Sequence, residues 1–243
     1  MDDQSPHVVE IIRRIREGST EPFLCRCDDG FMYVVKSMPT MPPRQLIAEF
    51  ISACLACDVG LPFPEFTIVY VPEELVEFIP DLRNEIKAGY AFATRYVENA
   101  VSLSFAQSRN DNIIPLNDQK MIYVFDRWII NVDRTLSDKG GNVNMLLDVK
   151  DNRYYLIDHN LAFDQNATLR DFNEHVFSHL TRSWQIDMVD RLAHREKLLK
   201  TYRKMPLFWE NIPESWLSED QFAAIIDTTL ERATGDDFWS SII

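Results

Sequence analysis

Three polar residues in the middle of the chain have the types and positions that metal-assisted chemistry requires. Asp133 lies in the stretch FDRWIINVDRT, Asn144 lies in NVNMLL, and Asp158 lies in YLIDHNLAF. Each of these side chains stands at the edge of an apolar run. Carboxylate and amide oxygens are hard ligands of the kind that Mg²⁺ binds. We therefore expect Asn144 and Asp158 to bind a divalent cation in a cleft that Asp133 also lines.

A helix is predicted to support Asp133. Apolar residues recur before it at helical spacing, at Met121, Phe125, Trp128 and Val132. This pattern predicts a helix from about Asp118 to Asn131, which delivers Asp133 just past its end on a rigid support.

A β-hairpin is predicted to bring Asn144 and Asp158 together. The stretches MLLDV and RYYLI read as two short strands around Asp151 and Asn152, a pair that suits a two-residue turn. In that register Asn144 lies opposite His159, and Asp158 lies beside Asn144 at the open end of the hairpin.

The first hundred residues are predicted to form a mostly antiparallel sheet with one helix. Residues 23–36 read as a hairpin around an Asp-Gly turn, and this hairpin ends in Lys36. Residues 65–71 and 90–97 read as further strands. The stretch PPRQLIAEFISACLACDVGLPFP has a helical period between its prolines and Gly60, with Glu49 at the margin of its apolar stripe. The remainder of the chain reads as mostly helical.

The order of these parts is more informative than any one of them. A lysine at a strand end is usually solvated, a glutamate at a helix margin is usually exposed, and an aspartate before an arginine usually forms a salt bridge. Here a hairpin lysine, a helix glutamate, a carboxylate after a helix, an asparagine at a strand start and an aspartate at the next strand end follow in sequence. This is the arrangement of protein-kinase-type phosphoryl transfer, in which positioning and charge neutralisation supply most of the catalysis.

Composition narrows the classes of partner. The chain has 243 residues, of which 46% are hydrophobic, so it can bury a substantial core. Its formal net charge of −13 opposes non-specific binding to nucleic acid and to anionic membranes. No signal peptide and no membrane span are evident. We expect a cytoplasmic protein with no direct nucleic-acid or membrane partner.

Cysteine and histidine spacings leave a metal site of another kind open. The C-x-C at residues 25–27 and the C-x-x-C at residues 54–57 could together bind zinc through four thiolates. The first pair shares a strand face and the second shares the apolar side of a helix, so small core residues are favoured. His175 and His179 have metal spacing without a third ligand nearby, which favours a partly exposed helix face.

The motifs taken together resemble the HipA-like kinase family in its compact, single-module branch. They are GSTEPFLCRCDDGFMYVVK, AEFISACLACDVGLPFPE, FDRWIINVDRT, NVNMLL, YLIDHNLAF and IPESWL, and they span about Gly18 to Leu217. The resemblance implies an α+β, protein-kinase-like two-lobe fold. An antiparallel, β-rich N-lobe would occupy residues 1–97, and a mostly helical C-lobe would occupy residues 98–243.

The resemblance also implies roles for individual residues. Lys36 matches the family's lysine on the nucleotide phosphates, and Glu49 matches the acidic partner that orients it. Asp133 matches the catalytic base that positions the attacking hydroxyl group. Asn144 and Asp158 match the residues that hold Mg²⁺ against the β- and γ-phosphates of ATP.

Two further segments are matched to nucleotide binding. Gly18, Ser19 and Thr20 occupy the place of the loop over the phosphates. The stretch TRYV occupies the place of the interlobe hinge that bonds adenine, through Thr94, Tyr96 and Val97. Because toxins of the family phosphorylate a serine in the phosphate loop, autophosphorylation of Ser19 or Thr20 is a further hypothesis.

The chain departs from the kinase pattern at three points. Its phosphate loop has one glycine, Gly18, rather than a glycine-rich run. Ten residues separate Asp133 from Asn144, against about four in a typical protein kinase, which makes Asn142 an alternative metal ligand. Asn131 stands where many kinases have a histidine.

The resemblance implies an ATP- and Mg²⁺-dependent kinase that phosphorylates a protein serine or threonine. One alternative is a small-molecule kinase of similar fold, because a net charge of −13 would attract a cationic substrate. The other is an inactive pseudokinase that binds nucleotide without turnover. The resemblance further implies a protein substrate and an antitoxin-like partner.

Overall fold

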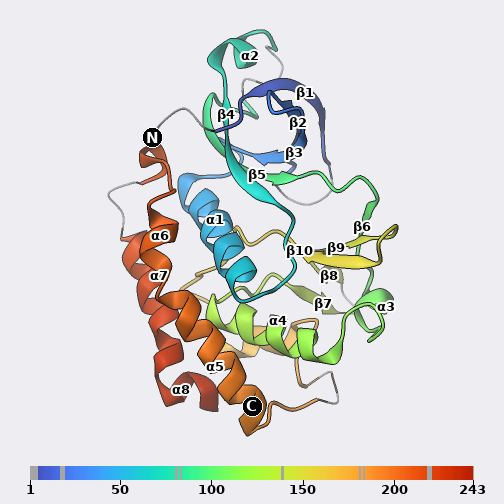
Figure 1. Cartoon of the computed structure of the whole chain (residues 1–243), viewed down its shortest axis with the longest axis vertical. Helices are drawn as coiled ribbons and strands as arrows, with labels where there is room; N and C mark the ends of the chain where they lie inside the picture. Colours follow the sequence, from blue (N-terminus) through green and yellow to red (C-terminus); the bar gives the residue numbers. More distant parts are fainter. Residues whose placement is uncertain are drawn as a thin grey trace. The chain divides into compact units, whose positions relative to one another are not determined.

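A computed structural model describes residues 5–16, 20–79, 82, 84–137, 140–180, 182, 184–217 and 221–242 (Figure 1). The chain divides into two compact units. Unit 1 comprises Met1–Phe50, Pro64–Glu98 and Ile212–Ser218, and unit 2 comprises Ile51–Phe63, Asn99–Asn211 and Glu219–Ile243. None of the helices among the described residues is long and apolar enough to cross a bilayer.

Unit 1 contains a five-stranded antiparallel sheet in the order β1-β2-β3-β5-β4. The strands are β1 (Val8–Arg14), β2 (Phe23–Cys27), β3 (Met32–Lys36), β4 (Phe66–Val71) and β5 (Gly89–Arg95). The predicted hairpin is confirmed as β2 and β3, and Gly30 in its turn has φ +84°, a conformation that glycine adopts at little cost. Alternation along β2 buries both of its cysteines and exposes Arg26 between them.

Helix α1 (Pro43–Asp58) begins at the predicted prolines and ends before Gly60, which has φ +87°. Cys54 is half-buried, but Cys57 is exposed. The expectation that both lie on the apolar side was therefore wrong for Cys57. Unit 1 also contains a short helix that the sequence did not predict, α2 (Glu73–Glu77). The third segment of unit 1, Ile212–Ser218, contains Trp216. Trp216 is fully buried and donates its indole N–H to the carbonyl of Tyr90 (3.2 Å).

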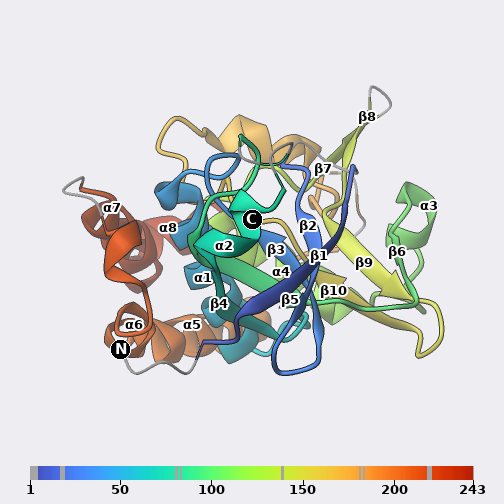
Figure 2. The ribbon, with the colours of Figure 1, turned by 90° about the horizontal axis from the view of Figure 1, so that it is seen from above.

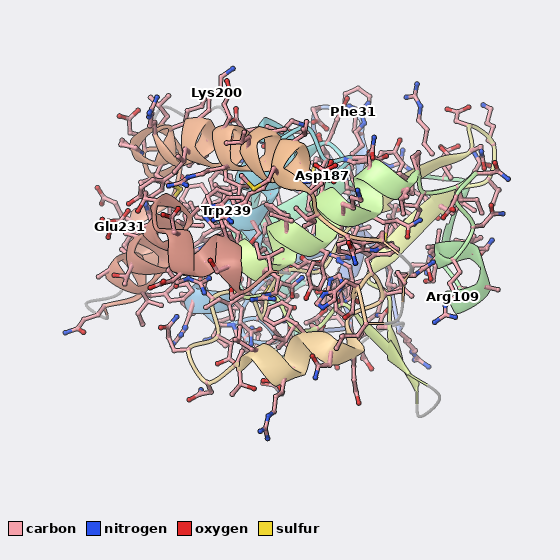
Figure 3. All side chains as sticks on the ribbon, turned by 90° about the horizontal axis from the view of Figure 1, so that it is seen from below. Phe31, Arg109, Asp187, Lys200, Glu231 and Trp239 are labelled. Atoms are coloured by element: carbon pink, nitrogen blue, oxygen red, sulfur yellow. The ribbon has the colours of Figure 1, made fainter. Side chains whose placement is uncertain are left out.

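Helical residues outnumber strand residues in unit 2, and its described residues also form two small sheets. Its helices are the part of α1 from Ile51 onward, α3 (Phe105–Ser108), α4 (Leu116–Trp128), α5 (Met188–Tyr202), α6 (Met205–Trp209), α7 (Phe222–Glu231) and α8 (Asp236–Ser240), with 3₁₀ turns at Leu169–Glu174 and Arg232–Thr234. Trp239 lies inside the group formed by α5, α7 and α8, whereas Lys200 and Glu231 lie at its surface (Figure 3). A three-stranded antiparallel sheet pairs β6 (Ala100–Ser102), β9 (Met145–Asp148) and β10 (Arg153–Leu156) in the order β10-β9-β6.

The ten residues between Asp133 and Asn144 contain an antiparallel hairpin. Its strands, β7 (Thr135–Ser137) and β8 (Gly140–Asn142), run out from the rest of unit 2 (Figure 2). The connection between Asp133 and Asn144 thus forms a β-hairpin over the part that the structure describes.

The predicted register of the second hairpin was wrong. Asp148 pairs with Arg153, so the turn contains four residues, 149–152, rather than two. The carboxylate of Asp148 accepts the backbone N–H groups of Lys150 (2.9 Å) and Asp151 (3.3 Å). This side-chain turn lengthens the connection. The carbonyl of Asn144 consequently accepts the N–H of Ile157 (3.1 Å), and Asn144 does not lie opposite His159.

Candidate functional site

Lys36 and Glu49 form a buried ion pair in unit 1. Lys36 is the last residue of β3, and its ammonium group bonds the carboxylate of Glu49 in α1. The Lys36 side chain is 12% exposed, and the Glu49 side chain is fully buried. A buried carboxylate is costly unless it is paired. The structure therefore joins these two predicted residues, and it places Glu49 deeper than the margin position that the sequence suggested.

The predicted phosphate loop connects β1 to β2. The backbone N–H of Ile15 donates to the carbonyl of Pro22 (2.8 Å), which closes the base of the loop. Thr20 is half-buried, whereas Gly18 and Ser19 lie outside the described residues. The assignment of this loop to the phosphates stays a prediction.

The predicted hinge residues lie at the end of β5. Thr94 is within the strand, opposite Val34 and Phe66, and Tyr96 and Val97 follow the strand. The N–H of Tyr96 already donates to the carbonyl of Met32 (2.9 Å). If this segment binds adenine, we expect Tyr96 to contribute its carbonyl oxygen rather than its N–H group.

Asp133 and Asn144 are joined by a hydrogen bond in unit 2. The Nδ2 atom of Asn144 donates to Asp133 Oδ2 (2.9 Å) and more weakly to the Asp133 carbonyl (3.3 Å). Because both partners are acceptors, they fix which end of the amide is the nitrogen. The Oδ1 atom of Asn144 is buried and has no hydrogen-bond partner among the described residues. A buried unsatisfied acceptor is unfavourable, so this oxygen suits a cation ligand.

The rival metal ligand, Asn142, is engaged elsewhere. Its side chain is exposed, and its Oδ1 atom accepts the backbone N–H of Asn144 (3.0 Å). Asp158 is half-buried and follows Ile157, whose N–H bonds the Asn144 carbonyl. Asn144 and Asp158 are thus close together along the paired backbone, as predicted. The error in the predicted register did not separate them, because it was a shift of two residues, and such a shift keeps each residue on the same face of the hairpin.

The donor set around Asn144 fits a hard cation such as Mg²⁺. It offers Asn144 Oδ1, which has no hydrogen-bond partner among the described residues, and the carboxylate of Asp158, which follows the residue bonded to the Asn144 carbonyl. No group of three or more His, Cys, Asp or Glu side chains among the described residues has metal-binding geometry. An amide-containing set does not depend on such a group.

Left-handed backbone recurs where these residues lie. Ile130, Asn144 and Asp158 have φ angles of +51°, +50° and +61°. Asparagine and aspartate tolerate this region, but a β-branched isoleucine does not readily adopt it. Helix α4 ends at Trp128, three residues before the predicted end at Asn131, because Ile130 turns the chain out of the helix. Such strain of about 1–3 kcal/mol per residue persists where the surroundings over-determine the backbone.

A buried carboxylate near the end of α4 holds the loop that carries Asp133. Asp126 Oδ1 accepts Asn131 Nδ2 (2.9 Å), and Asp126 Oδ2 accepts Arg134 Nε (2.7 Å) and His175 Nε2 (2.8 Å). His175 is 1% exposed and the other three are fully buried. The amide of Asn131 therefore ties the loop to the helix.

Sequence reasoning missed this network. His175 was expected on a partly exposed helix face, and that expectation was wrong: it follows a 3₁₀ turn and is buried against Asp126. The signal that could have found it is the pair of charges, Asp126 and Arg134, that flank a largely apolar stretch. Charged residues at such positions are rarely buried unless paired.

The two titratable groups have perturbed pKa values. Burial alone would raise the pKa of the Asp126 carboxyl, but Arg134 and His175 hold it well below its ordinary value. Burial lowers the pKa of His175 below its ordinary value, against the opposing effect of Asp126. His175 Nδ1 accepts the N–H of Phe177 (3.0 Å), so the neutral ring carries its proton on Nε2 and donates to Asp126.

His175 should make the stability of the protein depend on pH between 7 and 5. In the unfolded chain His175 takes up a proton near its ordinary pKa of 6.5, whereas the folded ring resists protonation because its pKa is lowered. The unfolded state then binds more protons, so the free energy of unfolding falls as the pH falls below about 6.5. In urea denaturation, the free energy of unfolding of the His175→Gln variant should fall less between pH 7 and 5 than that of the wild type.

His7→Gln, at a half-exposed site in unit 1, serves as the control for this variant. Equal dependence of the free energy of unfolding on pH in the wild type and in His175→Gln would contradict this role of His175.

Asn144→Asp is expected to weaken metal binding, although carboxylate is the stronger cation ligand in general. The new carboxylate would face Asp133 Oδ2 at the position where Nδ2 now donates at 2.9 Å. Two carboxyl groups in such contact favour sharing a proton over ionising together. We expect the affinity for Mn²⁺, titrated with a non-hydrolysable ATP analogue, to fall at least about tenfold.

Asn142→Asp is the matched control for that variant. It makes the same exchange two residues away and keeps an oxygen acceptor for the N–H of Asn144. We expect Mn²⁺ affinity close to that of the wild type. If Asn142→Asp lowered the affinity for Mn²⁺ and Asn144→Asp left it unchanged, Asn142 rather than Asn144 would be the amide ligand.

Comparisons with known proteins bear on the family and the fold of the chain, and the roles of the individual site residues stay predictions. A family model described as HipA-like kinase matches residues 8–242. Among solved structures, the chain is similar to the proinflammatory kinase CtkA of Helicobacter pylori, with a TM-score of 0.55 and 12% identity over 93% of this chain and 91% of that one. It is also similar to a golgi casein kinase, with a TM-score of 0.51 and 14% identity over 98% of this chain and 70% of that one. At these identities the likeness concerns the fold alone, and it confirms the predicted α+β, protein-kinase-like fold. The search of curated proteins found no match.

Proposed function

The chain belongs to the HipA-like kinase family, and on that premise we propose that it is an ATP- and Mg²⁺-dependent phosphotransferase that modifies a serine or threonine of a protein. In this reaction the acceptor oxygen forms a bond to the γ-phosphorus of ATP. The bond from that phosphorus to the β,γ-bridging oxygen breaks, and ADP leaves.

The residues of unit 1 would act on the phosphates of the nucleotide. The ammonium group of Lys36 would bond phosphate oxygens and stabilise their negative charge. Glu49 is a fully buried partner on a helix, so it holds that ammonium group in one place. Such pre-organisation favours charge stabilisation in the transition state, because no reorganisation is needed when the charge develops.

The residues of unit 2 would orient the acceptor and hold the cation. The Asp133 carboxylate would accept a hydrogen bond from the attacking hydroxyl group and receive its proton. Asn144 Oδ1 and the Asp158 carboxylate would be the protein ligands of Mg²⁺. When bound, Mg²⁺ neutralises charge on the β- and γ-phosphate oxygens.

The observation that carries this proposal is the orientation of the Asn144 amide. Its nitrogen is committed to Asp133, and its oxygen is buried without a partner among the described residues. The same contact aligns a carboxylate that could receive a proton with an oxygen that could bind a cation. A purely structural asparagine would be expected to satisfy both ends of its amide.

The acceptor class rests on the resemblance to the toxin branch of the family, in which protein serines are modified. The net charge of −13 would also suit a cationic small molecule. ADP formation in the presence of degenerate serine and threonine peptides, compared with cationic small molecules bearing hydroxyl groups, separates these acceptors. The antitoxin-like partner and the cytoplasmic location stay predictions.

The role of Lys36 is tested by exchanging it for arginine. Lys36→Arg keeps the charge next to Glu49, but a planar guanidinium cannot place a point charge as an ammonium group does. We expect ADP formation at least about tenfold slower, which corresponds to about 1.4 kcal/mol in the activation free energy. Lys120→Arg is the matched control, since the Lys120 side chain is 13% exposed and pairs with Asp190 (2.6 Å). Equal rates in the two variants would argue against a phosphate-binding role for Lys36.

A further inference from the structure

Arg134 contacts four groups from three separate segments of unit 2. Its Nε atom donates to Asp126 (2.7 Å), and its Nη1 atom donates to the carbonyls of Val143 (3.1 Å) and Asn144. Its Nη2 atom bonds His159 Nε2 (2.9 Å). The side chain is fully buried. A single guanidinium thus links the end of α4, the two residues before β9 and the segment that follows β10.

The contacts with the two carbonyls bear directly on Asn144. This residue has φ +50°, and its N–H donates to Asn142 (3.0 Å) while its carbonyl accepts Ile157 N–H (3.1 Å) and Arg134. With the backbone held on both sides, the direction of the side chain follows from its rotamer alone. Movement of either carbonyl would rotate the amide and displace Oδ1 from its present position.

The fourth contact reaches the residue that follows Asp158. Arginine has only donors, so His159 Nε2 must be the acceptor, and the neutral ring carries its proton on Nδ1. The ring packs against Phe63 (5.7 Å between centroids) and Phe125 (6.0 Å). His159 is therefore held by packing against these two rings and by Arg134, which restrains the left-handed backbone of Asp158 beside it.

We propose that Arg134 is a positioning residue that sets the orientation of the two metal-binding side chains, Asn144 and Asp158. The inference rests on the proposed phosphotransferase function. Asp126 balances the charge of Arg134, and the remaining guanidinium N–H groups bond the backbone next to one ligand and the side chain next to the other. A lysine could keep the ion pair, but it could not span all four acceptors, because its three donors radiate from one atom.

The test compares Arg134→Lys with Arg232→Lys by titration of Mn²⁺ in the presence of a non-hydrolysable ATP analogue, followed by electron paramagnetic resonance. Arg232 is a matched control, since its guanidinium also donates to three carbonyls of unit 2, those of Thr229, Arg127 and Trp128. Thermal unfolding of each variant is recorded in parallel. We expect Arg134→Lys to lose about tenfold or more in Mn²⁺ affinity, and Arg232→Lys to stay within about twofold of the wild type even where its melting temperature falls.

His159→Leu provides a second variant that leaves the Asp126 ion pair intact. It removes the acceptor of Arg134 Nη2 from an apolar site, and we expect a several-fold loss of Mn²⁺ affinity. Wild-type affinity in both folded variants would overturn the positioning role while leaving the phosphotransferase in place. A wild-type chain that binds no Mn²⁺ with the analogue would instead overturn the proposed metal site, and this inference with it.

Discussion

Asp133→Asn is expected to slow phosphoryl transfer by about two to four orders of magnitude while it preserves the cation site. The amide oxygen of the variant can still accept Asn144 Nδ2, which now bonds Asp133 Oδ2 at 2.9 Å. The variant cannot receive a proton from the acceptor hydroxyl group, and loss of a general base typically costs about 10²–10⁴ in rate. We expect kcat to fall by this factor, with Mn²⁺ affinity and ATP-dependent thermal stabilisation close to wild type.

Two comparisons make that result specific. Asp133→Ala removes the acceptor as well as the base, so it should lose Mn²⁺ affinity in addition to rate. Asp118→Asn is the matched control, because Asp118 is a half-exposed carboxylate that accepts the hydroxyl group of Tyr154 (2.8 Å) in the same unit. It should retain the wild-type rate. A rate within about threefold of wild type for Asp133→Asn would remove this residue from the chemistry.

Asp126→Ala is expected to have the largest effect on stability. The change leaves the Arg134 charge buried and uncompensated, and it removes the acceptor of Asn131 and His175. Breaking a buried ion pair on one side typically costs about 3–5 kcal/mol. We expect the free energy of unfolding, measured by urea denaturation at pH 7, to fall by this amount.

The dependence of the wild-type free energy of unfolding on pH in acid gives an independent measure of how much the Asp126–Arg134 pair stabilises the fold. Since the pKa of Asp126 is lowered from its ordinary value of 3.8, its contribution is fully present at higher pH and is lost as the pH falls below that value. Asp236→Ala is the control, because Asp236 pairs with Arg195 (2.9 Å) on the surface, where its side chain is 79% exposed. Exposed pairs contribute about 0–1 kcal/mol. Similar losses in Asp126→Ala and Asp236→Ala would contradict the importance of the buried network.

Much of unit 1 follows from local patterns. The β2–β3 hairpin and α1 were predicted because a turn pair, prolines and a terminal glycine mark their ends within the sequence itself. Strand β1 was missed, because bulges between Val8 and Glu10 and between Ile11 and Arg13 break the alternation that identifies a strand. The segment around Trp216 joins unit 1 through contacts that no local pattern encodes.

The candidate site likewise contains residues that the sequence predicts and contacts that only the structure reveals. Lys36 and Glu49 could be named from their order along the chain, but the burial of Glu49 depends on packing around α1. The predicted register of Asn144 was wrong because the Asp148 carboxylate accepts backbone N–H groups of the turn that follows it, which makes this turn two residues longer than the predicted one. The Arg134 network needed the structure, since it joins residues from Asp126 to His175 that only the tertiary fold brings together.

The most direct measurement is transfer of labelled γ-phosphate from ATP to a degenerate mixture of serine and threonine peptides, with Mg²⁺ and with chelator. The proposed function predicts labelled phosphoserine or phosphothreonine with the wild-type protein in the presence of Mg²⁺. It predicts none with chelator and an initial rate at least about a hundredfold lower with Asp133→Asn. Thermal stabilisation by ATP without label in any peptide and without ADP formation would contradict it and would leave the two alternatives, a nucleotide-binding pseudokinase and a small-molecule kinase without its acceptor.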